Sequence, residues 1–484
     1  MDAPLHTAPL PANLASMEQE QVNDVVLQLR NAVLEEVPLS LKWRRSQLKA
    51  LKLMLSENYE RIKESLKTDL GRSNFEVMTE IDGIIADCSH AISNLKSWNK
   101  DDPVSLPVVH AMSSASIHHD PKGVVLIISP WNYPWNLCLG PLIGCIAAGN
   151  CAVIKPSELS PASSSLLEEL CAKYLDTRAI RIIQGDKEVT MQLLSHQFDH
   201  IFYTGSGRVA RIVMGAAAQF LTPVTLELGG KNPCIVWNDA DLNLAAKRIA
   251  WCKTSNCGQL CLSVDYIICH QSTVEALTAK IRERFVKMFG ENALMSADYG
   301  RIINELHTKR LVNLLEKTKG QIVAPGSDSA APRWDEDAKY VAPLLVKNVQ
   351  MDDILMQDEI FGPILPIVSI PDGADLNAVL RLLQGLDKPL AIYCFSKSKS
   401  LWQAIKVRSR SGGLVINDCL IHFTVKTLPF GGIGGSGTGA YHGKYSFEEF
   451  SHSKSVLNAT SVDLPLRYAP YTEKKETWAK KLFF

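Results

Sequence analysis

The chain has 484 residues, of which 46% are hydrophobic and 21% are charged, and its 51 basic residues are balanced by 51 acidic ones. This composition is typical of a globular protein and excludes a largely unstructured chain, while the zero net charge gives no attraction to nucleic acid or to an anionic membrane. The length exceeds what one hydrophobic core supports and predicts two large lobes.

The first third of the chain changes from helical to strand-like patterning. Apolar residues at helical spacing over 17–69 predict two amphipathic helices, and a third is predicted over 74–98. Residues 113–119 alternate like an exposed strand. From Gly123 onward, five short apolar runs separated by helices predict a doubly wound parallel sheet that binds a nucleotide. The predicted strands are 124–128, 152–154, 180–183, 200–203 and 224–226, and the predicted helices are 136–148, 161–174, 188–195 and 208–220.

No residue between Lys122 and Lys155 carries a formal charge, which resembles a membrane span. Prolines, glycines and asparagines interrupt the stretch, and such breaks would leave backbone groups unsatisfied in lipid. We therefore expect the strand, helix and strand of a protein core.

The same alternation resumes after residue 230 and predicts a second α/β lobe. Its predicted elements are strands at 234–237, 266–269 and 344–346, helices at 242–253 and about 375–385, and a polar loop at 326–336.

The twelve cysteines include no C-x-x-C pair, and the first residues do not form a secretory leader. We therefore expect a reduced compartment, either the cytoplasm or the cytosolic face of an intracellular membrane. Cys252, Cys257 and Cys261 do not fall at zinc-finger spacings, so no metal site is predicted. The chain ends on apolar residues after basic ones at 478–484, which fits either a frayed terminal helix or a removed membrane tail, and membrane contact is expected only in the second case.

Two motifs predict covalent catalysis at a carbonyl carbon. Glu227 precedes the tight turn Gly229–Gly230, and Cys261 follows a glycine in the run Asn256-Cys-Gly-Gln-Leu-Cys. A thiol nucleophile served by a carboxylate base suits this spacing. A free cysteine is more often an inert core residue, and the glycine and the upstream carboxylate favour the catalytic interpretation.

Other motifs follow predicted strands, where ligands bind in open parallel sheets. Asn132 lies between two prolines and can donate to an oxyanion, although asparagine is also common in turns. Lys155 and Glu158 can hold a ribose or phosphate; alternatively, Lys155 is simply exposed and Ser157 is a helix N-cap. The Tyr203-Thr-Gly205-Ser206-Gly turn can face a pyrophosphate, or can merely join strand to helix. In the run 356–363, Glu359 can clamp a sugar and Phe361 can pack on a planar ring, or the two can be a surface glutamate beside a core phenylalanine.

The motifs PWNYP, KPSE, TGSG, LELGGK, NCGQLC, EIFGPILP and LPFGGIGGSGTGAYHGKYSFEEFSH occur in this order. This combination resembles the NAD(P)-dependent aldehyde dehydrogenases, and specifically the class 3 branch that includes fatty aldehyde dehydrogenases, from about residue 20 to 455. The resemblance implies that Cys261 adds to the aldehyde carbon and that Asn132 stabilises the oxyanion. Hydride then passes to the nicotinamide, and water activated by Glu227 releases the acid from the thioester.

The resemblance also implies a cofactor, NAD or NADP, and the residues that contact it. The expected cofactor contacts are Lys155 with Glu158 at the adenosine ribose, Gly205 and Ser206 at the pyrophosphate, Glu359 at the nicotinamide ribose, and Phe361 near the nicotinamide. Two departures from the family pattern are Ala210, where a glycine is frequent, and Ser263-Val264 in place of Ala-Pro; the second leaves substrate fit open.

The family fold implies two doubly wound α/β lobes and a small β oligomerisation module, with a homodimer as the expected assembly. The expected division is 1–105 with 122–228 for the NAD(P)-binding domain, 229–430 for the catalytic domain, 106–121 with 431–460 for the module, and 461–484 for a tail.

We therefore predict oxidation of a medium- or long-chain aliphatic, isoprenoid or apocarotenoid aldehyde to its acid. One alternative is a protein of this fold that binds NAD without turnover, which the intact nucleophile and base disfavour. Another is an enzyme that passes the thioester to coenzyme A, which would have no use for Glu227 as a base.

Overall fold

The computed structural model describes residues 19–326, 331–462 and 465–483. Four helices open the described chain: α1 (Gln19–Leu34), α2 (Leu41–Glu57), α3 (Tyr59–Leu70) and α4 (Asn74–Trp98). The prediction of two helices before residue 70 was wrong, because the chain breaks twice there. Pro38 and the N-cap Ser40 separate α1 from α2, and Asn58 both ends α2 and begins α3. The prediction for α4 is confirmed.

The first large sheet has the order β17-β7-β6-β3-β4-β5, and its five longer strands are parallel. The strands are β3 (Val124–Ile128), β4 (Cys151–Lys155), β5 (Ile180–Ile182), β6 (His200–Gly205), β7 (Val224–Leu228) and the antiparallel edge strand β17 (Gly437–Thr438). The crossover helices are α5 (Asn136–Ala148), α6 (Pro161–Tyr174), α7 (Lys187–Leu194) and α8 (Gly207–Ala218). The strand order reverses between β3 and β6, which is the point where doubly wound sheets bind ligands.

The charge-free stretch after Lys122 lies at the centre of this lobe. Strands β3 and β4 are buried along their whole length, and most of α5 between them is buried as well. The prediction of a protein core is confirmed. Among the described residues, no helix is both long and apolar enough to cross a bilayer.

The second large sheet has the order β10-β13-β14-β9-β8-β15-β16, and all of its neighbouring strands are parallel except β10 with β13. Its strands are β8 (Pro233–Val236), β9 (Tyr266–His270), β10 (Gln321–Val323), β13 (Leu344–Lys347), β14 (Ile364–Ile370), β15 (Ala391–Phe395) and β16 (Gly413–Ile416). Its helices are α9 (Leu242–Thr254), α10 (Val274–Phe289), α11 (Glu305–Lys317), α12 (Ile354–Gln357), α13 (Leu376–Gln384) and α14 (Lys399–Arg408). A short ladder, β11 (Trp334–Asp335) with β12 (Tyr340–Val341), begins inside the predicted polar loop, of which residues 327–330 lie outside the described residues.

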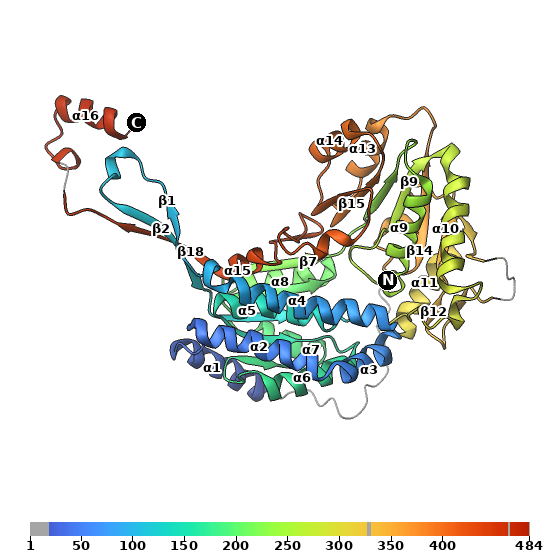
Figure 1. The fold of residues 1–484 in the computed structure, drawn as a ribbon, viewed down its shortest axis with the longest axis horizontal. Helices are drawn as coiled ribbons and strands as arrows, with labels where there is room; N and C mark the ends of the chain where they lie inside the picture. Colours follow the sequence, from blue (N-terminus) through green and yellow to red (C-terminus); the bar gives the residue numbers. More distant parts are fainter. Residues whose placement is uncertain (1–18, 327–330, 463–464, 484) are drawn as a thin grey trace.

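A three-stranded antiparallel sheet projects as an arm from the lobe of the first large sheet (Figure 1). It contains β1 (Asp102–Val104), β2 (Ser114–Pro121) and β18 (Ser451–Asn458), and the terminal helix α16 (Glu473–Phe483) lies beside its tip. Residues 431–450 do not join this sheet. They run back along the lobe of the first large sheet through β17 and α15 (Lys444–Glu449), and Phe447 and Phe450 are buried in that lobe's core. We therefore propose narrower module limits, with 102–121 and 451–458 as its strands.

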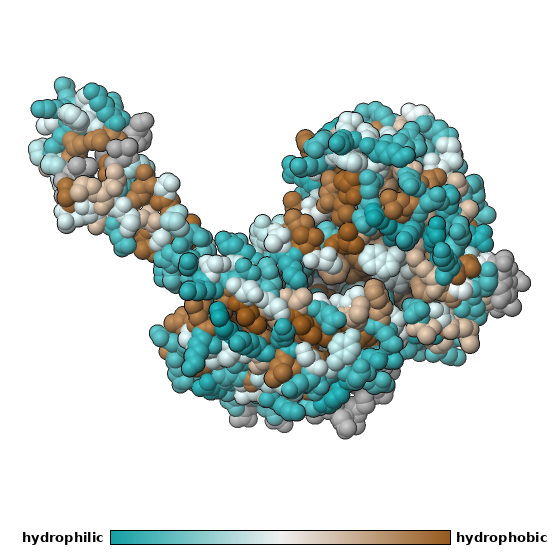
Figure 2. Space-filling view, viewed as in Figure 1, coloured by the Kyte–Doolittle hydropathy of each residue, from teal (hydrophilic) through white to brown (hydrophobic). Residues whose placement is uncertain are grey.

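Figure 2 shows a hollow between the two lobes in which hydrophobic side chains are visible. The carboxyl edge of the first sheet and the loop after α9 both carry motif residues from the sequence.

Candidate active site

Four of the sequence-predicted residues come from the carboxyl edge of the first sheet. Asn132 follows β3, Lys155 ends β4, Gly205 ends β6, and Glu227 is the next-to-last residue of β7. Because β3, β4, β6 and β7 are neighbours in register, these residues meet at one edge around the switch point.

The Asn132 loop is held by a buried ion pair that the sequence did not reveal. Arg72 and Glu80 have fully buried side chains and lie 2.6 Å apart. Arg72 donates to the backbone carbonyl of Asn132, and one oxygen of Glu80 accepts from the backbone N–H groups of Trp135 and Asn136 at 3.0 and 2.9 Å. The pair therefore fixes both sides of the loop that carries Asn132.

The cysteine loop is in a left-handed conformation that brings it against this first loop. Asn256, Cys257 and Gly258 have φ of 49°, 54° and 71°. The Nδ2 of Asn132 donates to the carbonyl of Gln259 at 3.0 Å, and the Nδ2 of Asn256 donates to the carbonyl of Asn132 at 2.9 Å. Two hydrogen bonds therefore join the two loops, and the residue that Asn132 contacts, Gln259, is two positions before Cys261 in the chain.

Cys261 differs from the other cysteines in its exposure. It is half-buried, whereas the other eleven are buried. Burial, then the facing carboxylates of Glu359 and Glu227, raise the pKa of its thiol, and the backbone N–H groups of Cys261 and Leu262 oppose this effect. The sulfur is therefore a thiol in the resting protein, with two carboxylates facing it.

Glu227 is buried, and neither of its carboxyl oxygens has a hydrogen-bond partner within the described part of the chain. Burial, then the carboxylate of Glu449, raise the pKa of Glu227 well above its ordinary value. A buried carboxyl without a partner is costly and is typical of a functional group rather than of a structural one.

Glu359 and Phe361 are brought to the same place by a second buried ion pair. Lys231 and Asp265 lie 2.5 Å apart; Lys231 also donates to the carbonyl of Asp358, and Asp265 accepts from the backbone N–H of Ile360. The half-buried Glu359 lies against the glycine turn 229–230, and burial, then Asp265, raise its pKa to about 8.

Gly258 explains why the two loops can touch. A Cβ at this position would collide with the carbonyl oxygen of Gly362, and its φ is in the left-handed region. Phe361, next to Gly362, contacts Trp131 edge to face, with ring centroids 5.4 Å apart. Hence the loops bearing Asn132, Cys261 and Phe361 form one junction.

The predicted adenosine contacts lie at the far side of this edge. Lys155 is buried rather than exposed, and its Nζ lies 2.8 Å from Glu158, which is partly exposed. At the end of β6, a Cβ on Gly205 would meet the hydroxyl of Tyr203, and Ser206 caps α8 by accepting from the N–H of Val209 at 3.4 Å. A helix N-terminus beside a glycine is a suitable cradle for a pyrophosphate.

The junction also holds buried polar groups without partners in the described chain, as expected of a site that a dinucleotide and a substrate fill. The buried Nζ of Lys253 and both oxygens of Glu227 lack partners among the described residues, and Lys253 faces Asp265, Lys231 and Glu359. Burial lowers the pKa of Lys253 to about 8, the direction expected of a buried amine that lacks a partner. Sequence reasoning missed Lys253 because a lysine in an amphipathic helix is ordinarily exposed.

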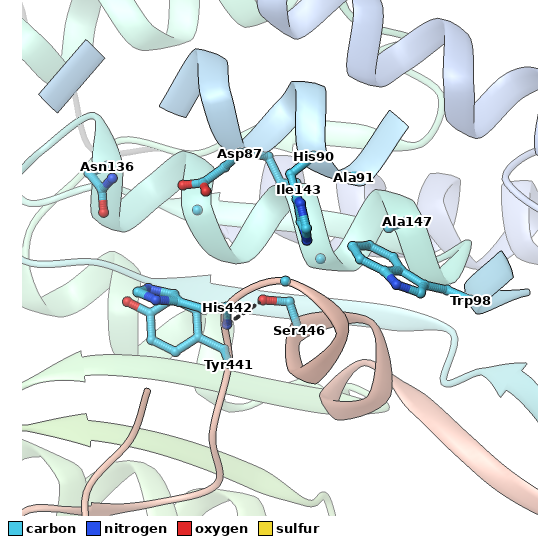
Figure 3. Close-up of a pocket in the computed structure, with 13 residues that line it drawn as sticks. Asp87, His90, Ala91, Trp98, Asn136, Ile143, Ala147, Tyr441, His442 and Ser446 are labelled. Carbon is cyan, nitrogen blue, oxygen red and sulfur yellow. Dashed lines mark hydrogen bonds between the residues drawn. The ribbon is translucent and has the colours of Figure 1, made fainter. Parts of the chain in front are cut away.

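A pocket lies next to the junction, between α4, α5 and the segment 441–446 (Figure 3). Its walls include the apolar side chains of Trp98, Ile143 and Ala147. The polar lining is Asp87, His90, Asn136, His442 and Ser446. Tyr441 also lines it and faces Glu227 and Cys261, so the pocket adjoins the junction.

A doubly wound sheet whose switch point faces a cysteine on a second α/β lobe defines a class of dinucleotide-dependent, thiol-bearing enzymes. Residues 4–456 match the family model described as the aldehyde dehydrogenase family. The chain therefore belongs to the aldehyde dehydrogenase family and is an NAD(P)-dependent oxidoreductase of aldehydes.

Its relatives identify the class 3 branch. The chain is 44% identical over 459 residues to aldehyde dehydrogenase family 3 comG of Dictyostelium discoideum, which covers 94% of this chain and 95% of that protein. It is 41% identical over 437 residues to the dimeric NADP-preferring aldehyde dehydrogenase of Rattus norvegicus, over 90% and 94% of the two chains. A structure of Staphylococcus aureus AldH in a substrate-bound state matches with a TM-score of 0.91 and 37% identity, over 96% and 99% of the two chains. These matches confirm the predicted α/β fold and the family resemblance.

Proposed function

We propose that this protein oxidises medium- or long-chain apolar aldehydes, including isoprenoid and apocarotenoid aldehydes, to carboxylic acids through a thioester on Cys261. The convergence of Cys261, Glu227, Asn132 and Glu359 at one junction carries the proposal.

The first step joins the sulfur of Cys261 to the aldehyde carbon. The thiol proton must leave as the C–S bond forms. The facing carboxylates of Glu359 and Glu227 are the acceptors we assign, and either one passes the proton on to solvent before water is activated. The carbonyl oxygen becomes an oxyanion, for which the second amide hydrogen of Asn132 and the backbone N–H of Cys261 are the donors.

When bound, NAD or NADP accepts the hydride that leaves the former aldehyde carbon, and the carbon is left as a thioester. Lys155 and Glu158 hold the adenosine ribose, the turn at Gly205 and Ser206 holds the pyrophosphate, and Glu359 holds the second ribose. Phe361 limits the space beside the ring, since its own ring is fixed against Trp131.

Glu227 then completes the reaction. Its carboxylate takes a proton from water as the water oxygen attacks the thioester carbon. The C–S bond breaks, the acid leaves, and the sulfur takes a proton to restore the thiol. A carboxyl with a raised pKa is a stronger base than an ordinary one, which is why burial without a partner serves this step.

The pocket of Figure 3 supports an apolar substrate. Trp98, Ile143 and Ala147 offer apolar walls in the same pocket as Tyr441, and burial of a methylene contributes about 0.8 kcal/mol. The ratio kcat/KM should therefore rise with aldehyde chain length before it levels off.

One experiment separates the candidate functions. Purified protein is given saturated aldehydes of increasing length with NAD or NADP, with and without coenzyme A, and free acid and reduced cofactor are measured. Free acid formed without coenzyme A, and lost in Cys261→Ser, supports the proposal. Acid that requires coenzyme A identifies the acylating enzyme, and cofactor binding without turnover on any aldehyde identifies a binding protein.

We also propose that the arm mediates a homodimer. Apolar side chains are exposed on it and on the segment after it, and a second copy of the chain would cover them. They are Val104, Met112, Leu457, Val462, Tyr468, Tyr471 and Trp478. Light scattering should give twice the chain mass of 53.4 kDa, and a monomer at micromolar concentration would contradict this assembly.

A further inference from the structure

A second carboxylate lies near Glu227. Glu449 ends α15, and its Oε1 accepts a hydrogen bond from the hydroxyl of Thr225. Gly439 leaves the space for this contact: a Cβ there would lie 2.7 Å from the methyl group of Thr225 and 2.8 Å from Oε1 of Glu449. The contact brings a charged group from the C-terminal segment onto strand β7.

Thr225 and Glu227 are two residues apart on β7, so their side chains point to the same face of the strand, about 7 Å apart along it. The carboxylate that Thr225 holds is therefore on the same face as the carboxyl of Glu227. The electrostatics agree with this placement. Burial contributes most to the raised pKa of Glu227, and the negative charge of Glu449 is the second cause.

A directed chain of hydrogen bonds connects Glu449 to the edge of the lobe. The Nζ of Lys122 lies 3.2 Å from Nδ1 of His200, and Nε2 of His200 lies 2.8 Å from Oγ1 of Thr225. An ammonium group has only donors, so Nδ1 accepts, Nε2 carries the proton, and the hydroxyl of Thr225 is free to donate to Glu449. The donors of Lys122, His200 and Thr225 thus run in one direction toward Glu449.

Burial, then Lys122, lower the pKa of His200 well below its ordinary value, so the imidazole is neutral at physiological pH and keeps this single tautomer. Among the described residues, Glu449, the thiol of Cys261 and the hydroxyl of Tyr441 face Glu227. Glu449 is the carboxylate of this set, and the carboxyl of Glu359 faces the same thiol from the second lobe.

We propose that Glu449 is a positioning residue for acid release: the chain Lys122–His200–Thr225 fixes its carboxylate beside Glu227, and the negative charge makes Glu227 a stronger base toward water. The inference rests on the proposed role of Glu227. It assigns a catalytic consequence to Lys122, His200, Thr225 and Glu449, to which the sequence alone assigns no role.

The pH dependence of thioester hydrolysis tests this assignment. Enzyme is acylated rapidly with decanal and NAD, and release of decanoate is followed by quenched flow from pH 5 to 9. In Glu449→Gln the neutral amide keeps the acceptor for Thr225 and loses the charge. The acid limb, the pH range in which the rate of decanoate release falls as Glu227 is protonated, should move to lower pH by about one unit. Above that range the rate of decanoate release should fall about threefold, because the base is weaker.

Glu448→Gln is the matched control. It removes the same charge from the adjacent position of α15, where Glu448 forms an exposed ion pair with Lys444 at 3.1 Å. The acid limb of this variant should coincide with that of the unaltered protein. Thr225→Val removes the hydroxyl that donates to Glu449 and nearly keeps the side-chain volume. It should shift the acid limb in the same direction as Glu449→Gln, and it replaces that variant in the test if Glu449→Gln does not fold.

The possible results distinguish the role of Glu227 as the base from the role of Glu449 beside it. If Glu227→Gln abolishes the acid limb while Glu449→Gln and Thr225→Val leave it in place, Glu227 is the base and the inference is wrong. If Glu227→Gln itself leaves the limb unchanged, the proposed function fails first. A shift to higher pH in Glu449→Gln would also overturn the inference.

Discussion

Glu227→Gln should stabilise the folded protein at alkaline pH while it removes catalysis. The carboxyl of Glu227 is 3% exposed, and its oxygens have no hydrogen-bond partner among the described residues. Its ionised form is therefore less favourable in the folded protein than in the unfolded chain, where water solvates it. Gln has a similar shape and carries no charge.

The pH dependence follows from the direction of the pKa shift. Burial, then Glu449, raise the pKa of Glu227 in the folded state, so the folded protein holds a proton that the unfolded chain releases near pH 4. Below that pH both states are protonated and the residue has no effect. As the pH rises toward the folded-state pKa, stability falls by about 1.4 kcal/mol per unit, and above that pKa the loss is constant.

Gln keeps a buried polar group and loses only the charge, so the gain of Glu227→Gln is the linkage effect alone: roughly 1–3 kcal/mol at pH 8, at about 1.4 kcal/mol per pH unit, and nothing at pH 4.5. For a chain of 484 residues the gain corresponds to a rise in thermal midpoint of roughly 1–3 °C. Thermal unfolding at both pH values measures it, with Glu448→Gln as the control for loss of an exposed charge. If Glu227→Gln is no more stable than the unaltered protein at pH 8, the carboxyl is not strained by burial and the reasoning is refuted.

Three further variants test other parts of the structure. Glu80→Gln leaves the buried guanidinium of Arg72 without its charged partner and should cost about 3 kcal/mol, seen as a fall of roughly 3 °C in thermal midpoint. An unchanged midpoint would contradict the role of the pair. Gly258→Ala forces a Cβ toward the carbonyl of Gly362 and should lower kcat at least ~10-fold with secondary structure retained, measured by steady-state kinetics and circular dichroism. Glu158→Gln removes a negative charge from the adenosine side of the site and should raise the ratio of kcat/KM for NADP to that for NAD about fivefold; a ratio that falls would exclude this position for Glu158.

The strands of the first sheet could be predicted closely from the sequence because they are buried on both faces. A strand such as Val124–Ile128 is a continuous apolar run, bounded by a glycine on one side and a proline turn on the other. The helices before residue 70 were harder, since one amphipathic pattern continues across Asn58 and the break there is local.

Some residues of the candidate site could be predicted from the sequence and others could not. Cys261, Glu227 and Asn132 could be identified because each belongs to a short motif with glycines or prolines that fix its backbone. Arg72 and Glu449 could not, because their roles depend on partners 60 and 224 residues away. An arginine in a short loop or a glutamate at a helix end has no local pattern that distinguishes a buried partner from solvent.

The central claim is that the sulfur of Cys261 carries the acyl group between oxidation and acid release. Glu227→Gln should arrest the reaction after oxidation, so this variant is mixed with decanal and NAD, digested, and analysed by mass spectrometry. The peptide that contains Cys261 should carry one decanoyl group in place of one hydrogen, with one equivalent of reduced cofactor formed per site. Reduced cofactor without a label on Cys261, or a decanoyl group on another residue, would contradict the account.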